Sequence, residues 1–221
     1  MKKILPALIT GLLLSGATHA DENPVTAEKL SDSVYVLFGQ GGNIAASVGE
    51  DGIYIIDDQF AKLSNDIKKT ISDLKLHFNN EHAHVVHYAY AHTDGDSVIF
   101  FNNDNIVHMG DIYFNFGSLP FVDVDSGGSV DGILAAVNDV IKQIDERTIG
   151  IPGHGPVSDR SGLVTYAKLV KKAKDLMLKA MQNNASLEQE IKADPLAELG
   201  LEYAGWLPKE KVTTLFYRSL K

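Results

Sequence analysis

The sequence contains no cysteine in its 221 residues. This absence excludes disulfide bonds, thiolate metal ligands and a cysteine nucleophile. It also excludes the attachment of a lipid to an N-terminal cysteine. Any metal ion must therefore be held by imidazole and carboxylate groups.

Positive charge is scarce, and no block of basic residues follows the start of the chain. Lys and Arg number 20 against 29 Asp and Glu, which gives a net charge of −9 at pH 7. Nucleic-acid-binding proteins carry basic patches, so we expect a small-molecule substrate and not a nucleic acid as the partner. An apolar fraction of 44% allows a sizeable core.

Long apolar runs are also lacking, apart from one at the N-terminus. Lys2 and Lys3 precede an apolar run from Ile4 to Leu14, and small residues then lead to Ala20. This order is typical of a secretory signal peptide, and the run is too short to span a bilayer as a helix. We expect cleavage after Ala20, the alternative being an uncleaved amphipathic anchor. Cleavage removes two positive charges and no carboxylate, so the net charge changes from −9 to −11.

The mature chain, residues 21–221, is then expected to be one domain in the periplasm or outside the cell, without membrane attachment. Short β-rich runs separated by Gly, Asp and Glu predict strands in a meander. These strands are Ser33–Phe38, Asn43–Val48, Gly52–Ile56, Ala83–Tyr88, Ser97–Asn102, Asn105–His108 and Thr148–Ile151. Apolar residues at helical spacing predict helices over Ala61–Leu74, Ser129–Ile144, Leu163–Met181, a short segment from Ser186, and Pro208–Leu220.

Local signals mark two helix starts and one long loop. Ser129 is in an N-cap position, and Ser186 with Gln189 has the spacing of a capping box. The Phe-, Gly- and Asp-rich segment from Ile112 to Gly128 is predicted to be a loop. A loop of this length is unusual in a compact domain and tends to be functional.

Three residues are candidate metal ligands because each lies at the end of a predicted strand. They are His92, Asp111 and His154, each next to Gly or close to Asp. Strand ends on one edge of a sheet sandwich can converge, and imidazole with carboxylate suits Zn, Mn or Fe. The alternative for Asp111 is a structural role as the cap of the following loop.

The other histidines have weaker arguments for metal binding. His82 and His84 share one strand face by the two-residue period, whereas His87 points the other way, so a regular strand does not bring all three together. His108 follows an apolar strand and precedes a Met. We therefore expect His108 to be structural.

Four segments resemble the metallo-β-lactamase superfamily of metal-dependent hydrolases. They are Ala91–Ser97, His108–Asp111, Pro120–Ser129 and Ile151–Pro156. The strands that end at Asp57 resemble the opening strands of the family. The segment Trp206–Pro208, with Phe216 and Tyr217, resembles its C-terminal end. The resemblance covers nearly the whole mature chain. It implies an α/β (α+β) fold, a metallo-β-lactamase-like αββα sandwich.

The resemblance also implies roles for the candidate ligands. His92 would be the third imidazole of a first metal site, Asp111 the carboxylate bridging two metals, and His154 the imidazole of the second site. The metals, zinc in this family, would lower the pKa of a bound water and polarise the bond under attack. The implied reaction is hydrolysis of an amide, an ester or a lactam.

One family motif is absent. The His-x-His-x-Asp-His signature, which supplies two ligands to the first metal and an Asp-His pair to the second, occurs nowhere in the chain. It should follow a strand after the Ala61–Leu74 helix, but that helix leads into Leu76–Phe78, which resembles a strand from much later in the family. The sequence therefore resembles a deletion near Leu74–Leu76. His82 and His84 lie on a strand and do not replace the motif.

The missing motif predicts an impaired site on a fold truncated in its first half, with exposed apolar surface. A catalytic zinc usually keeps three protein ligands and a water. Here His92 alone would remain for the first metal, and Asp111 with His154 for the second. We therefore expect one weakly bound zinc ion, with His84 or His87 recruited at most.

Three functions remain open at this point. The first is an exported hydrolase with impaired activity. The second is a non-catalytic exported binding protein or an inactive deletion variant of such a hydrolase. The third possibility is a dimer in which the partner completes the sheet.

Overall fold

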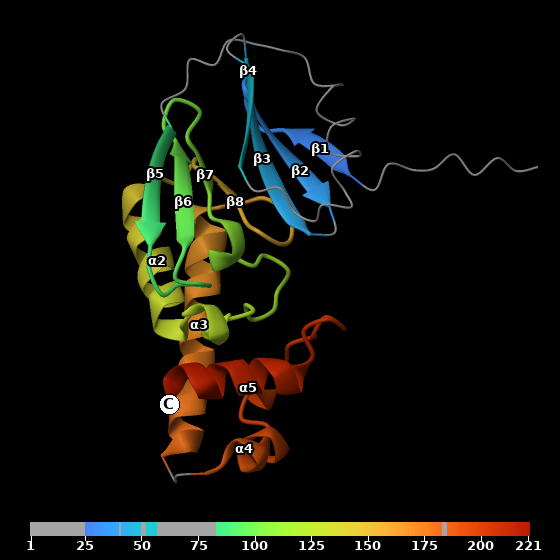
Figure 1. The fold of residues 1–221 in the computed structure, drawn as a ribbon, viewed down its shortest axis with the longest axis vertical. Coiled ribbons are helices and arrows are strands. Elements are labelled where there is room, and N and C mark those ends of the chain that lie inside the picture. The colour runs from blue at the N-terminus through green and yellow to red at the C-terminus, as the bar shows by residue number, and fades with distance from the viewer. Residues whose placement is uncertain (1–24, 40, 50–51, 57–82, 183–184) are drawn as a thin grey trace, which may run out of the picture.

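Two β-sheets face each other in the computed structural model, and helices lie beyond one of them (Figure 1). The structure describes residues 25–39, 41–49, 52–56, 83–182 and 185–221. The predicted signal peptide, the predicted helix Ala61–Leu74, the Leu74–Leu76 junction and His82 lie outside the described residues.

The first sheet is an antiparallel meander in the order β1-β2-β3-β4. Its strands are β1 (Thr26–Lys29), β2 (Val34–Gly39), β3 (Gly42–Gly49) and β4 (Gly52–Ile56). The strands predicted at β2, β3 and β4 are confirmed, because runs of β-branched and aromatic residues favour extended structure. The pattern missed β1, whose residues are exposed and largely polar.

The second sheet has the order β5-β6-β7-β8-β9. Its strands are β5 (Ala83–Tyr88), β6 (Asp96–Phe101), β7 (Ile106–His108), β8 (Ile149–Ile151) and β9 (Ser158–Asp159). The predicted hairpin of β6 and β7 is present, and β7 pairs in parallel with β8. The connection between these parallel strands contains a helix, as such crossovers usually do.

Four α-helices follow the predicted positions closely. They are α2 (Val130–Gln143), α3 (Arg160–Met181), α4 (Leu187–Ala193) and α5 (Lys209–Leu220). The Ser129 hydroxyl accepts a hydrogen bond from the Gly132 N–H at 2.9 Å, and the capping box at the start of α4 is formed. In the described part of the chain no helix has the length and apolar character needed to cross a membrane.

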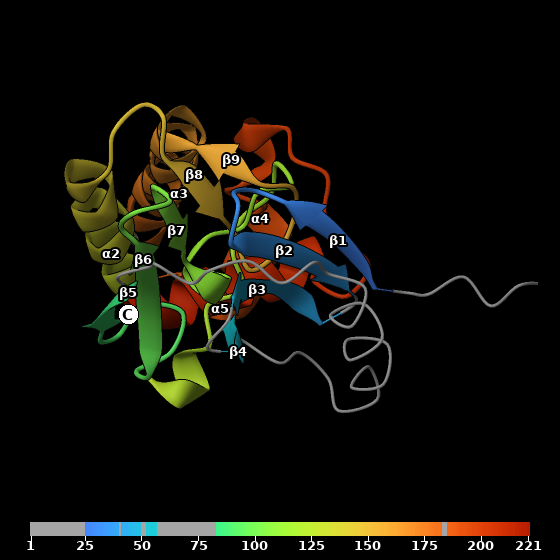
Figure 2. The ribbon, with the colours of Figure 1, turned by 90° about the horizontal axis from the view of Figure 1, so that it is seen from above.

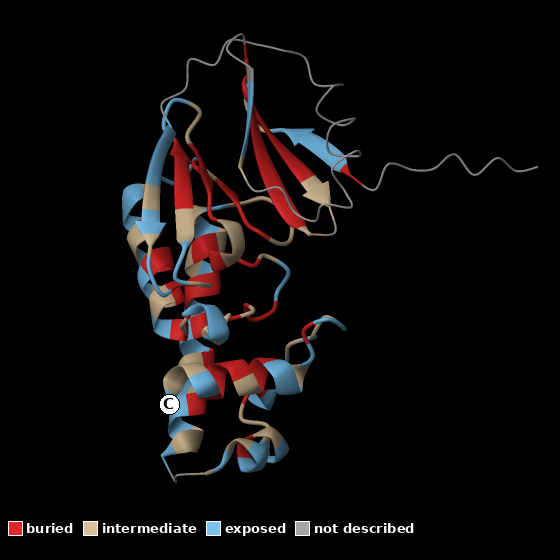
Figure 3. Cartoon of the chain, in the orientation of Figure 1, coloured by how far each residue is buried: buried red, intermediate tan, exposed pale blue. Residues whose placement is uncertain are grey.

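The two-residue period of the strands divides the core into layers. Val34 and Val36 of β2 pack between the sheets against residues of β6 such as Ile99 and Phe101. The alternate side chains of β6, including Phe100, face α2 and α3 on the other side of the second sheet. Figure 2 shows α2 and α3 on the side of the second sheet that faces away from the first sheet, and in Figure 3 most of β2, β3 and β6 has the colour of buried residues.

The edge strands β4 and β5 expose large apolar side chains. Tyr54 is 61% exposed and Val85 is 60% exposed, and β4 and β5 stand at the ends of their sheets. Apolar side chains are therefore exposed at these two sheet edges.

Candidate metal centre

Asp111 lies between the two candidate histidines. Its Oδ1 is 3.4 Å from His154 Nε2, and its Oδ2 is 3.9 Å from His92 Nε2. Asp111 belongs to a short 3-10 helix, Gly110–Ile112, directly after β7. The three side chains therefore lie close together, and each imidazole faces a different oxygen of the same carboxylate. Whether the three residues bind a metal stays a prediction.

The loop that carries His154 is held by Asn43, a residue of β3 in the opposite sheet. The Asn43 side-chain amide donates hydrogen bonds to the carbonyl oxygens of Pro152 at 2.7 Å and Gly155 at 2.8 Å. Its backbone N–H donates to the Gly153 carbonyl oxygen at 2.6 Å. Sequence reasoning missed Asn43; the available signal was a single amide side chain in a predicted strand of otherwise small or apolar residues.

Gly153 allows this loop to approach Asp111. A Cβ atom at this position would lie 2.1 Å from Asp111 Oδ1 and 2.6 Å from the Gly110 carbonyl carbon. The Gly153 N–H donates to the Gly110 carbonyl oxygen at 2.7 Å. Any larger residue would separate the segment of His154 from that of Asp111.

The predicted functional loop from Ile112 to Gly128 holds the backbone around His92. The Asp123 N–H donates to the His92 carbonyl oxygen at 3.0 Å. A Cβ atom at Gly128 would lie 1.9 Å from that same oxygen. The loop also forms a parallel β-bridge between Phe114 and His154, so it connects the surroundings of both imidazoles.

Carboxylates surround the His92 ring. Asp96 Oδ1 lies 3.6 Å from His92 Nδ1, and Asp111 stands on the other side. Burial lowers the pKa of His92, but the neighbouring carboxylates outweigh it and the net shift is upward. Burial also raises the pKa of Asp96. The hydrogen bonds from His92 and from the Thr93 N–H outweigh burial, so the net shift of the Asp96 pKa is downward. Asp96 thus orients a ring that stays accessible, with 15% of its side chain exposed.

Aromatic rings flank both imidazoles. The Phe114 ring stacks on His154 with 4.9 Å between ring centroids, and the Trp206 ring lies 5.5 Å away. Phe121 lies 5.9 Å from the His92 ring. Trp206 comes from the segment that precedes α5, so the C-terminal part of the chain completes the surroundings of this site.

Imidazole and carboxylate are groups that zinc binds, and one of the two distances between them fits zinc geometry. Two ligands at about 2.05 Å from a tetrahedral zinc stand roughly 3.4 Å apart. The Asp111 to His154 separation of 3.4 Å matches this value, whereas the 3.9 Å to His92 requires a side-chain movement. Among the described residues no group of three His, Cys, Asp or Glu side chains is arranged to hold a metal ion.

The remaining described histidines lie elsewhere. His84 and His87 are exposed on β5; the His84 ring lies 6.0 Å from Phe100, and His87 Nε2 lies 2.7 Å from the Asp94 carbonyl oxygen. His108 is 2% exposed, and its Nε2 lies 3.3 Å from the Asn43 carbonyl oxygen. The buried position of His108 agrees with its expected structural role.

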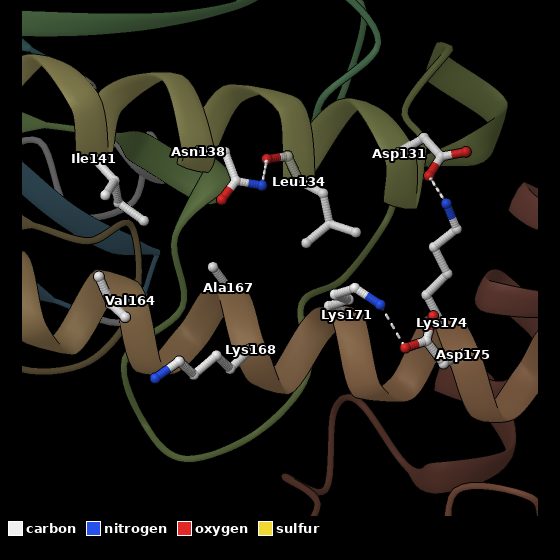
Figure 4. A pocket seen from close by; sticks show the side chains of 10 residues that line it. All are labelled: Asp131, Leu134, Asn138, Ile141, Val164, Ala167, Lys168, Lys171, Lys174 and Asp175. Carbon is white, nitrogen blue, oxygen red and sulfur yellow. Dashed lines mark hydrogen bonds and ion pairs between the residues drawn. The ribbon is translucent and has the colours of Figure 1, made fainter.

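A separate surface hollow of about 500 Å³ lies between α2 and α3 (Figure 4). Its lysines are largely committed to ion pairs, Lys171 with Asp175 and Lys174 with Asp131. None of the three candidate ligands lines it.

Solved structures of metallo-β-lactamases are similar to this chain. The DIM-1 enzyme superposes with a TM-score of 0.55 at 14% identity, over 67% of this chain and 98% of that one. The FIM-1 enzyme from Pseudomonas aeruginosa, in its mono-zinc form, gives 0.55 at 16% identity over 68% and 96%. A metallo-β-lactamase from Pontibacter korlensis gives 0.54 at 11% identity over 66% and 99%.

No protein-family model matches the sequence, and no curated protein matches it either. The structural likenesses confirm the predicted α/β sandwich and the resemblance in fold. At identities this low they show the fold alone.

Proposed function

We propose that this chain, which has the metallo-β-lactamase fold, is an exported hydrolase that holds one zinc ion weakly. Its reaction would be slow hydrolysis of an amide, lactam or ester bond in a small molecule. The observation that carries this proposal is the placement of Asp111, whose two oxygens face His154 at 3.4 Å and His92 at 3.9 Å.

Each residue of the site would have its own role. Asp111 and His154 have the separation that zinc requires, and His92 is the third donor after a small side-chain movement. When bound, zinc polarises the bond under attack and makes water acidic enough to act as a nucleophile near neutral pH. Phe114 holds the plane of the His154 ring, and Asp96 holds the His92 ring. Such supporting contacts orient metal ligands and tune their basicity.

We expect impaired hydrolysis because the site has few metal ligands. Three protein ligands and one open position are usual for catalytic zinc. Among the described residues, two donors have the separation that fits zinc and the third lies farther away. We therefore expect weak zinc binding and low turnover.

A non-catalytic exported binding protein, or an inactive deletion variant of a hydrolase, is the second candidate. It is favoured by the same described residues, in which no metal-holding group of three side chains occurs. In that case the surface around Asp111 would bind a small molecule without converting it.

Zinc binding and turnover distinguish the two candidates. The purified protein is titrated with zinc by calorimetry, and hydrolysis of nitrocefin and of 4-nitrophenyl acetate is followed with and without added zinc. Asp111→Asn and His154→Ala test the site. His84→Ala removes an exposed histidine outside it and serves as the matched control.

Zinc binding with one ion per chain, lost in both site variants and retained in His84→Ala, would support the hydrolase if turnover follows the same pattern. Zinc binding without turnover of any tested substrate would favour the binding protein. Turnover that survives in His154→Ala and Asp111→Asn would contradict both proposals for this site.

A further inference from the structure

Two exposed aromatic side chains pack on Phe114, the ring that stacks on His154. Trp206 is 51% exposed and Phe116 is 38% exposed. Both rings contact Phe114, at centroid distances of 6.4 Å and 5.6 Å, and Phe114 itself is 2% exposed. Single exposed apolar residues are ordinary on protein surfaces. Here the two rings share a buried aromatic support, Phe114, which stacks on the candidate metal ligand His154. Exposed apolar side chains gathered in one place are typical of a binding surface.

A lysine side chain lies on the other side of the site. Lys211 Nζ lies 4.8 Å from the centroid of the Phe121 ring, which in turn lies beside His92. The other long cations of α5 are committed to carboxylates, Lys209 to Asp194 and Arg218 to Asp125. Within the described residues Lys211 has no carboxylate partner, so its charge is available to an anionic ligand.

We propose that this surface selects a planar aromatic or conjugated substrate that carries a carboxylate. The flat group would stack on Trp206 and Phe116, the scissile bond would lie over Asp111, and the carboxylate would reach Lys211. The inference rests on the proposed function, since it names the substrate class of that same site. Aromatic stacking supplies affinity through offset or edge contacts, and an exposed lysine adds a charge contact.

The test uses metal-free protein, so that binding is measured without any contribution from zinc. After treatment with EDTA, the protein is titrated by calorimetry with biphenyl-4-acetate, with the neutral biphenyl-4-acetamide, and with the saturated 4-cyclohexylcyclohexaneacetate. The chain has a single tryptophan, Trp206. Its fluorescence therefore reports changes in the surroundings of this one side chain.

We expect biphenyl-4-acetate to bind with a saturable change in Trp206 fluorescence. The saturated acid should bind about threefold to tenfold more weakly because it cannot stack. The neutral amide should bind about twofold to fivefold more weakly because it lacks the charge.

Variants separate the two contacts. Lys211→Gln should weaken binding of the acid and leave binding of the amide unchanged. Trp206→Leu should weaken binding of both ligands. Lys221 lies over the Tyr217 ring at the far end of α5, at 5.7 Å, so Lys221→Gln is the matched control for the cation. Tyr54→Leu removes another exposed aromatic side chain and is the control for Trp206.

Equal affinities for the three ligands, or equal effects of Lys211→Gln and Lys221→Gln, would overturn the proposal. So would the absence of saturable binding. Because the protein is metal-free, these outcomes do not depend on zinc binding or turnover. A chain that fails to hydrolyse any ester can still bind the acid, and an active hydrolase can still fail to discriminate the ligands.

Discussion

The side-chain amide of Asn43 donates a hydrogen bond to the carbonyl oxygen of Gly155 at 2.8 Å, although 112 residues separate the two in sequence. Asn43 belongs to β3 of the first sheet, and Gly155 follows β8 of the second. The contact therefore connects the two layers at the point where His154 enters the site. It shows that one sheet positions a candidate ligand carried by the other.

Asn43→Ala should destabilise the fold. The change removes both side-chain hydrogen bonds to the His154 loop and leaves carbonyl oxygens without that donor, which costs about 1–3 kcal/mol for a buried group. Urea unfolding at pH 7 measures the free energy of unfolding. Asn138→Ala is the control, because the exposed Asn138 amide donates to the Leu134 carbonyl oxygen of its own helix, α2. Equal losses for both variants would argue against the positioning role of Asn43.

Gly153→Ala should disturb the geometry of Asp111 directly. The added Cβ would lie 2.1 Å from Asp111 Oδ1, far inside van der Waals contact, so either the carboxylate or the His154 loop must move. We expect a lower melting temperature and weaker zinc binding in calorimetry. Gly95→Ala is the control, since its Cβ would meet only Thr93 Oγ1, at 3.9 Å. A Gly153→Ala protein with unchanged stability and zinc affinity would contradict this assignment.

Ser129→Ala should cost about 0.5–2 kcal/mol of stability through the loss of an N-cap. The hydroxyl accepts from the Gly132 N–H and donates to the Tyr90 carbonyl oxygen at 2.8 Å, two residues before His92. Thermal unfolding measures the loss. Ser161→Ala provides the comparison, because the Ser161 hydroxyl donates to the Asp159 carboxylate on the surface of α3. A loss no greater than that of Ser161→Ala would exclude a capping contribution.

Asp145 should contribute to stability in a pH-dependent way. Hydrogen bonds from the Asn105 side chain and the Arg147 N–H hold its pKa at about 2, below the usual 3.8. The folded state therefore favours the ionised carboxylate, and this contribution is present above pH 4 and is lost as the pH falls toward 2. Asp145→Asn should be less stable than the parent at pH 7, and the difference should disappear near pH 2. Urea unfolding across this range measures it, and parallel curves for the two proteins would contradict the prediction.

Local features of the fold could be predicted because short-range patterns determine them. Short β-rich runs identified β2 and β3, an apolar run identified β6, and helical spacing identified α2. The caps at Ser129 and Ser186 were also correct, since a cap depends on residues only three positions apart. The strands β1 and β9 were missed because they are short, polar and paired at sheet edges, and their stability comes from neighbours distant in sequence.

The sequence by itself determined the chemistry that is open to the site. Without cysteine, the donors must be imidazole and carboxylate, and the positions of His92, Asp111 and His154 at strand ends followed from the strand pattern. Only the tertiary structure decided that Asp111 stands between the two rings, that Asn43 holds the His154 loop and that Trp206 lies beside it. The physical reason is range: the hydrophobic period acts over a few residues, whereas these contacts form only when two sheets and a C-terminal segment pack together.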